Sequence, residues 1–113
     1  MIQHTLLLAT EPFNAIAAGE KSIESRLYDE KRQQIQLGDS IQFINREAQE
    51  QTLDVKVVGL LRYETFHDMF MRNEPTKFGG ECAQWLENQI NEFYSVDQQQ
   101  QYGVLGIEFE RVD

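Results

Sequence analysis

The sequence is divided into short apolar segments, and the clearest of these segments alternate apolar and polar residues. Residues 53–57 read Leu-Asp-Val-Lys-Val, and residues 40–45 read Ser-Ile-Gln-Phe-Ile-Asn. Successive side chains of a strand point to opposite faces, so a period of two residues predicts strands with one buried face. The turn residues Gly38 and Asp39 precede the second segment. The pattern therefore limits the chain to a fold built on short strands.

The remaining elements follow from the same patterns and from helix signals. Pro12 stands at an early helical position, Gly19 is a typical helix stop, Thr65 is a candidate helix cap, and Gly59 suggests a bulge in a strand. Short strands with short helices favour an α+β fold, a compact barrel-like sheet with helices at its ends, over a doubly wound parallel sheet. The predicted strands are 5–9, 22–28, 40–45, 52–64 and 104–112, and the predicted helices are 12–19, 65–73 and 81–95, with a last helical turn at 96–103.

Composition indicates one small globular domain. The 113 residues are 41% apolar and include 12 aromatic residues, enough for one compact core. No segment reaches the roughly 20 apolar residues of a membrane span, and the first ten residues lack the features of a signal peptide, so we expect a cytoplasmic protein. Cys82 is a single cysteine and is expected to be structural, and the two histidines lack the spacing of metal ligands.

Charge narrows the range of partners. The net charge is −9, with −6 of it after residue 77, whereas residues 21–32 hold four basic side chains against three acidic ones. Binding of long duplex DNA or RNA by counterion release requires a broad basic face, which this composition argues against. A local site for a short or small ligand remains open.

The segment Gly-Glu-Lys-Ser-Ile-Glu-Ser-Arg, residues 19–26, carries the main candidate site. Lys21 follows a predicted helix end, where a cation is favoured, and Glu24 and Arg26 share one face of a predicted strand. In the structural alternative, Lys21 only interacts with the C-terminus of the helix, and Glu24 and Arg26 form an ordinary surface ion pair. In a functional reading, Arg26 suits a phosphate or a base edge, Glu24 accepts from an amino group, and Lys21 holds a phosphate or acts as a base.

The residues that follow extend this candidate site. Tyr28 is the aromatic residue best placed to stack on a base, and Lys31 and Arg32 form either a mixed-charge turn or a rim that contacts an anion. Trp85 lies on the apolar face of a predicted helix, where a core position is expected. Ser25 offers a hydroxyl, but no histidine stands near it in the sequence to activate it.

The pattern Gly-x-Lys-x-x-Glu-x-Arg resembles the ASCH domain family. The residues that carry the resemblance also include the opening 6–19, the segment Ile-Gln-Leu-Gly-Asp-Ser-Ile-Gln-Phe and the closing Tyr-Gly-Val-Leu-Gly-Ile-Glu-Phe. It covers residues 5–109 and implies one domain over 1–113, a PUA-like β-barrel of five to six strands. It also implies binding of RNA or of a nucleoside- or nucleotide-like molecule in a cleft lined by Lys21, Glu24 and Arg26. We expect no cofactor and no metal ion.

One branch of ASCH-like proteins suggests an enzymatic alternative. Its members are amidohydrolases that deacetylate acetylcytidine with a lysine, a threonine and a more distant glutamate. Lys21 stands at the lysine position, Glu24 replaces the threonine, and Glu81 or Glu74 corresponds to the glutamate. In an enzyme the catalytic residues would therefore be Lys21, Glu24 and Glu81. A third alternative is a protein-interaction module that uses the acidic C-terminal third of the chain.

Overall fold

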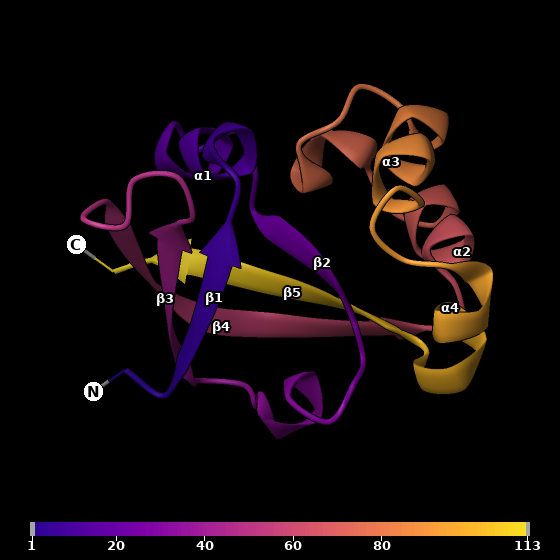
Figure 1. The fold of residues 1–113 in the computed structure, drawn as a ribbon, viewed down its shortest axis with the longest axis horizontal. Coiled ribbons are helices and arrows are strands. Elements are labelled where there is room, and N and C mark those ends of the chain that lie inside the picture. The colour runs from indigo at the N-terminus through magenta and orange to yellow at the C-terminus, as the bar shows by residue number, and fades with distance from the viewer. Residues whose placement is uncertain (1, 113) are drawn as a thin grey trace.

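The computed structural model describes residues 2–112, and its centre is one curved sheet (Figure 1). Within these residues the sheet has five strands in the order β1-β3-β4-β5-β2. β1 runs parallel to β3, and the other neighbouring strands are antiparallel. β1 and β2 are therefore the two edge strands. The strands are β1 His4–Leu8, β2 Ile23–Leu27, β3 Ser40–Asn45, β4 Thr52–Tyr63 and β5 Val104–Arg111.

Short helices cover two parts of this sheet. α1 follows β1 directly, whereas α2, α3 and α4 are grouped in the connection between β4 and β5 (Figure 1). Because Tyr63 pairs with Val104, this helical connection leaves and rejoins the sheet at one place. The helices are α1 Thr10–Ala17, α2 Phe66–Met71, α3 Ala83–Ile90 and α4 Val96–Tyr102, with 3-10 turns η1 Arg32–Gln34 and η2 Pro75–Phe78.

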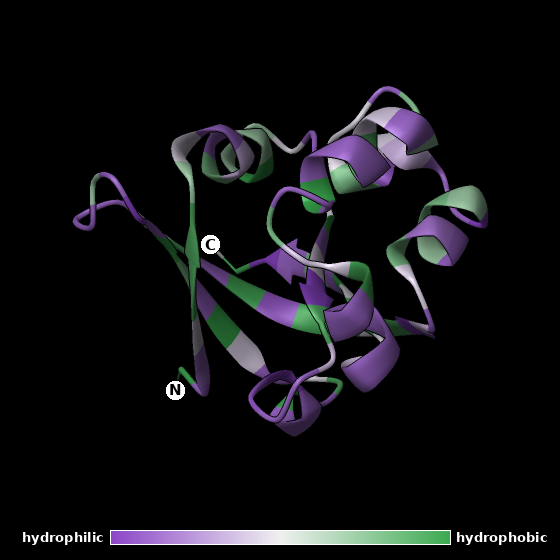
Figure 2. Ribbon diagram, turned by 45° about the vertical axis from the view of Figure 1, so that its right-hand side comes forward, coloured by the Kyte–Doolittle hydropathy of each residue, from purple (hydrophilic) through white to green (hydrophobic). Residues whose placement is uncertain are grey.

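The inner face of the curved sheet packs around one apolar core. Residues of β3 and of the first half of β4 alternate between buried and less buried positions, and Figure 2 shows hydrophobic and hydrophilic bands along the strands. Alternation places one row of side chains from each strand inside the curve, where α1 covers them. The buried residues of this inner core are Leu6, Leu8, Phe13, Ile16, Ile35, Ile41, Phe43, Leu53, Val55, Val57, Leu105, Ile107 and Phe109.

A second core joins the outer face of β2 to the helices. Ile23 and Leu27 point away from the inner core and pack against α2, η2 and α3. β2 is therefore covered on both faces, although it is an edge strand. The buried residues of this outer core are Ile23, Leu27, Phe66, Met69, Phe70, Phe78, Leu86 and Val104.

Two side chains bridge the edges of the curved sheet. Arg26 on β2 donates from Nη2 to the carbonyl oxygen of Leu7 on β1, at 2.7 Å. Lys31 donates from Nζ to the carbonyl oxygen of Thr5, at 3.2 Å. Both carbonyls lie on the unpaired side of β1, where an edge strand would otherwise expose them. The half-barrel is thus closed by side chains rather than by a further strand ladder.

Most of the predicted fold is confirmed. The class is α+β, and the five strands lie within one or two residues of their predicted limits. Gly19 has a left-handed backbone with φ +78°, and the register of β4 against β5 shifts between Val57 and Gly59, as a bulge requires. Thr65 caps α2 by accepting a hydrogen bond from the backbone of Asp68.

The prediction of one helix over 81–95 with a last turn at 96–103 is wrong. α3 ends at Ile90, and α4 is a separate helix that begins at Val96. Ser95 starts the second helix through a capping box in which its side chain binds the backbone of Gln98 and Gln98 binds back. Trp85 is also not a core residue, because 46% of it is exposed while Leu86 faces the outer core. Cys82 is exposed as well.

Candidate functional site

The end of α1 determines where β2 begins. Gly19 donates its N–H to the carbonyl of Ile16, and Glu20 donates to Ala15. These two bonds form a Schellman motif, which requires the left-handed conformation that glycine adopts at low cost. Ser22 then donates its backbone N–H to the carbonyl of Lys77 in η2. Lys21 is therefore held between α1, η2 and the first residue of β2.

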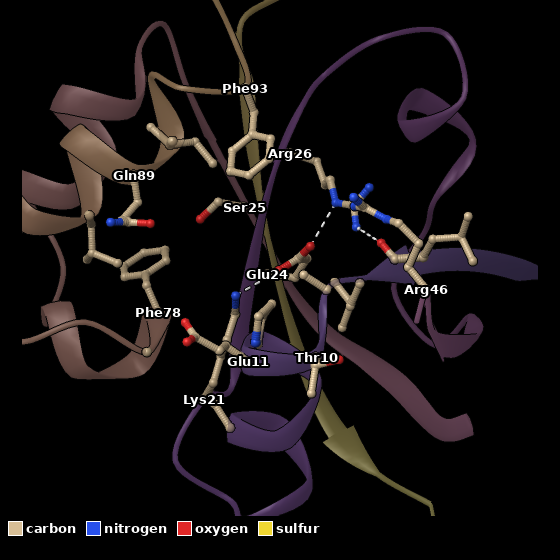
Figure 3. Close-up of a pocket in the computed structure, with 18 of the residues that line it drawn as sticks. Thr10, Glu11, Lys21, Glu24, Ser25, Arg26, Arg46, Phe78, Gln89 and Phe93 are labelled. Atoms are coloured by element: carbon tan, nitrogen blue, oxygen red, sulfur yellow. Dashed lines mark hydrogen bonds and ion pairs between the residues drawn. The ribbon is translucent and has the colours of Figure 1, made fainter. Parts of the chain in front are cut away.

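Three charged side chains meet next to this junction. Lys21 Nζ lies 2.9 Å from Oε1 of Glu24, and Arg26 Nε lies 2.7 Å from Oε2 of the same carboxylate (Figure 3). Glu24 and Arg26 pair with Ile107 and Leu105 of β5, so their side chains share the face of the inner core. The carboxylate thus separates two cations at the open side of the half-barrel. We call Lys21, Glu24 and Arg26 the charged triad.

The triad is largely buried, and its charges stabilise one another. Only 6% of the Glu24 side chain is exposed, with 12% for Lys21 and 13% for Arg26. Burial alone would raise the pKa of Glu24, but the charges and hydrogen bonds of Lys21 and Arg26 outweigh it and lower the pKa to about 2. Burial would lower the pKa of Arg26, whereas Glu24 raises it, and the net direction is upward. Glu24 is therefore ionised at neutral pH.

A cleft of about 600 Å³ opens over the triad. One wall comes from the end of β1 and the start of α1, and the opposite wall comes from η2, α3 and the segment after α3. β2 forms the floor between them. The cleft is lined mainly by Leu7, Thr10, Glu11, Lys21, Glu24, Ser25, Arg26, Arg46, Glu47, Phe78, Trp85, Leu86, Gln89, Ile90, Phe93 and Tyr94.

The helical wall presents aromatic surface, and the floor presents polar groups. Trp85 is 46% exposed and Phe93 is 65% exposed, although both are large apolar side chains. Ser25 Oγ and the carboxamide of Gln89 face each other across the cleft (Figure 3). Such a combination of apolar rings and few polar groups is typical of a small-molecule site.

The charges that line the cleft balance. The lining includes three basic side chains and three carboxylates, so their formal charges cancel. The basic side chains are Lys21, Arg26 and Arg46, and the acidic ones are Glu11, Glu24 and Glu47. A ligand of high negative charge would gain little from this balance. Polar contacts and stacking are better suited to a neutral or weakly charged molecule.

Three predicted binding residues lie away from the cleft. The ring of Tyr28 packs against the inner core and is covered by Arg62, whose guanidinium carbon is 3.8 Å from the ring centroid. Lys31 binds the carbonyl of Thr5, and Arg32 forms an ion pair with Asp29 at 3.0 Å. These side chains therefore have structural partners, and the structure does not bring them together with Lys21, Glu24 and Arg26.

The predicted third catalytic residue also lies elsewhere. Glu81 is exposed, as is Glu74, and neither lines the cleft. Glu11, in the first turn of α1, is the carboxylate that the fold adds beside the triad. Arg46, Gln89 and Phe93 were likewise missed, because they come from the β3–β4 turn and the far wall. No short-range pattern connects these positions with residues 19–26.

Over residues 2–112, no group of three or more His, Cys, Asp or Glu side chains is placed to hold a metal ion. Across the same range, no helix has the length and apolar character that a membrane span requires.

Comparisons with known proteins agree with this architecture. A family model described as the ASCH domain matches residues 6–113. Hypothetical protein PH0355 is 34% identical, with a TM-score of 0.85, over 96% of this chain and 98% of that chain. Protein PF0455 from Pyrococcus furiosus is 30% identical, with a TM-score of 0.76, over 100% of this chain and 99% of that chain.

More distant structures share the fold. The ASCH protein from Zymomonas mobilis has a TM-score of 0.64 at 12% identity, over 94% of this chain and 65% of that chain. The ASCH domain from Lactobacillus crispatus JV V101 has a TM-score of 0.63 at 14% identity, over 96% of this chain and 78% of that chain. A search among curated proteins found no match.

Proposed function

The chain belongs to the ASCH domain family, and from this membership we propose that it binds a nucleoside or a similar small molecule in the cleft over the charged triad. One observation carries the proposal: a buried charged triad and exposed aromatic side chains line the same cleft. Trp85 and Phe93 offer surface for stacking a planar ring. Glu24, Lys21 and Ser25 lie where the polar edge of that ring would rest.

The chemistry of the triad suits polar recognition. Glu24 uses one contact from each oxygen in its ion pairs, so each oxygen keeps a lone pair for a ligand amino or hydroxyl group. Lys21 uses one of its three donors on Glu24 and retains others for a carbonyl or phosphate oxygen. The two ion pairs also fix the positions of these groups before a ligand arrives, which reduces the entropy cost of binding.

The charge distribution favours a small ligand over a long RNA. The protein carries a net charge of −9, and the cleft adds no excess of basic side chains. RNA binding that depends on phosphate contacts would require such an excess. We therefore expect a nucleoside, a nucleotide or a short single strand with one inserted base.

The same geometry favours binding over the amidohydrolase alternative. Glu24 stands where the related hydrolases have a threonine, and its carboxylate is held in two ion pairs. Glu81 is exposed and does not line the cleft. Incubation of the pure protein with acetylcytidine provides the test, and we expect no deacetylation at high protein concentration. Hydrolysis that disappears in Lys21→Met would instead support an enzyme.

Calorimetric titration with the four common nucleosides and their 5′-monophosphates tests the binding proposal. We expect at least one to bind the wild-type protein and Lys21→Met to bind it at least tenfold more weakly. Lys31→Met is the matched control, because it removes a lysine that lies outside the cleft. Melting temperatures of both variants exclude unfolding as the cause. Absence of binding to the wild type, or equal losses in both variants, would refute the proposal.

A further inference from the structure

The backbone of β2 carries hydrogen-bonding groups that the sheet does not use. Tyr28 donates its N–H to Gly103 of β5, and Phe109 donates to the carbonyl of Ser22. In an antiparallel ladder, bonded and non-bonded pairs alternate along the strand. Residues 22, 24, 26 and 28 therefore direct their backbone groups toward β5, whereas residues 23, 25 and 27 direct theirs away from it.

Ser25 is the residue at which these unused groups meet the cleft. It pairs with Gly106 as a non-bonded pair, so its N–H and C=O point toward the open edge of the sheet. Neither group has a hydrogen-bond partner among residues 2–112, and Ser25 lines the cleft between its two charged neighbours, Glu24 and Arg26. The N–H donor and the C=O acceptor of Ser25 therefore lie side by side at the floor of the cleft.

The space beyond this edge is too restricted for another strand. The guanidinium of Arg26 crosses from β2 to β1 and binds the carbonyl of Leu7 at 2.7 Å. An added peptide strand would have to run along β2 and pass through this bridge. A short planar group can instead approach Ser25 from the cleft and end at the guanidinium.

We propose that the backbone N–H and C=O of Ser25 pair with the donor–acceptor edge of a nucleobase. This inference rests on the proposed function and specifies how the same cleft recognises its ligand. Every common base carries an N–H group next to a carbonyl or ring-nitrogen acceptor on its pairing edge. Two parallel hydrogen bonds between the base and Ser25 would match the two N–H···O=C bonds that opposite residues form in a hydrogen-bonded pair of an antiparallel sheet. Lys21 and Glu24 then lie beside the ring, and the aromatic wall covers it.

Proline at position 25 tests this pairing directly. Ser25→Pro removes the hydroxyl and the backbone N–H that faces away from β5, and proline is tolerated at such an edge position. Ser25→Ala is the matched control, because it removes the hydroxyl and keeps the backbone donor. We expect Ser25→Pro to bind the nucleosides about tenfold more weakly than Ser25→Ala does, and equal affinities of the two variants would refute the pairing. Thermal melting verifies that both variants are folded.

Modified nucleosides give a second measurement that needs no variant. Uridine is compared with 3-methyluridine and guanosine with 1-methylguanosine, and cytidine and adenosine are compared with their N,N-dimethylamino derivatives. Methylation removes the base donor that would pair with the Ser25 carbonyl, so it should weaken binding to the wild type about tenfold. This comparison remains informative on the wild type alone if Ser25→Pro does not fold.

The outcomes separate the two proposals. Binding that depends on Lys21 but tolerates both methylation and Ser25→Pro refutes the role of Ser25 and leaves the proposed function intact. Binding of an extended peptide that Ser25→Pro abolishes, without nucleoside binding, refutes both and identifies strand addition instead. If no nucleoside binds the wild type, the inference fails together with the proposed function.

Discussion

Replacing Glu24 by glutamine removes the anion that separates two buried cations. The pKa of Glu24 falls from its ordinary value of 4.5 to about 2 on folding, despite the opposing effect of burial. By linkage, this difference corresponds to a contribution on the order of 3 kcal/mol to the free energy of unfolding at neutral pH. Loss of one partner from a buried ion pair costs about 3–5 kcal/mol, which is consistent with that estimate.

The sign of the pH dependence follows from the direction of the pKa change. A carboxyl group whose pKa is lower in the folded state stabilises that state fully above its unfolded pKa. The contribution of Glu24 is therefore present above about pH 4.5 and is lost as pH falls toward about 2. Protonated glutamate resembles glutamine in shape and charge, so wild type and Glu24→Gln should become similar in stability within that window.

Urea denaturation followed by circular dichroism measures this effect at several pH values between 7 and 3. We expect Glu24→Gln to be less stable by about 3 kcal/mol at pH 7, and the difference to narrow below pH 4.5. The other carboxyl groups titrate in both proteins, so the difference reports on Glu24. Glu81→Gln is the matched control, since Glu81 is exposed, and should lie within about 0.5 kcal/mol of the wild type. A stability difference that does not change with pH would refute the reasoning.

Three further predictions follow from the packing. Trp85→Ala should lower the free energy of unfolding by less than about 1 kcal/mol and weaken nucleoside binding, whereas Leu86→Ala should lower the free energy of unfolding by about 2–5 kcal/mol. Urea denaturation measures the stabilities and calorimetry the binding. A larger loss of stability in Trp85→Ala than in Leu86→Ala would contradict the exposed position of Trp85. Arg26→Lys keeps the positive charge at this position of the triad, but an ammonium group cannot bind both the Glu24 carboxylate and the Leu7 carbonyl as the guanidinium does. We expect the free energy of unfolding to fall by about 1.5–3 kcal/mol in urea denaturation, and an unchanged midpoint would count against the bridge. Thr65→Ala removes the cap of α2 and should lower the free energy of unfolding by about 1 kcal/mol, while Thr65→Ser keeps the hydroxyl and should retain most of that stability. Equal losses of stability in the two variants would show that the hydroxyl does not act as a cap.

Local features of the fold could be predicted because each depends on one residue or on a few neighbouring residues. The stop at Gly19 needs one left-handed residue, and the cap at Thr65 needs one hydroxyl three residues before its partner. The alternation in β3 and β4 depends only on neighbouring side chains. The common face of Glu24 and Arg26 follows from the same rule, and the structure confirms that their side chains meet.

The surroundings of β2 could not be predicted from its own residues. The alternation within residues 22–28 predicts one apolar face, with Ile23 and Leu27, and one charged face, with Glu24 and Arg26. In the structure both faces are covered, because the sheet curves around one side and the helical connection packs on the other. Burial of Glu24 thus results from segments that are distant in the sequence, and no local pattern encodes it.

The extent of the site was missed for the same reason. Tyr28 and Lys31 are close to the triad in sequence, but strand geometry and the curvature of the sheet direct them to the inner core and to β1. Trp85 had the spacing of a core residue, yet α3 buries a narrower stripe that includes Leu86. The separate start of α4 depends on the capping box at Ser95, which marks a new helix rather than a continuation.

A titration followed by two-dimensional ¹⁵N NMR tests the central claim most directly. The cleft over the charged triad is proposed to bind a nucleoside, so addition of the four common nucleosides should shift amide signals of residues 21–26 and 85–94. The same signals should remain nearly unchanged in Lys21→Met. No shift with any nucleoside, or shifts confined to residues 28–34 and 62 outside the cleft, would contradict the account.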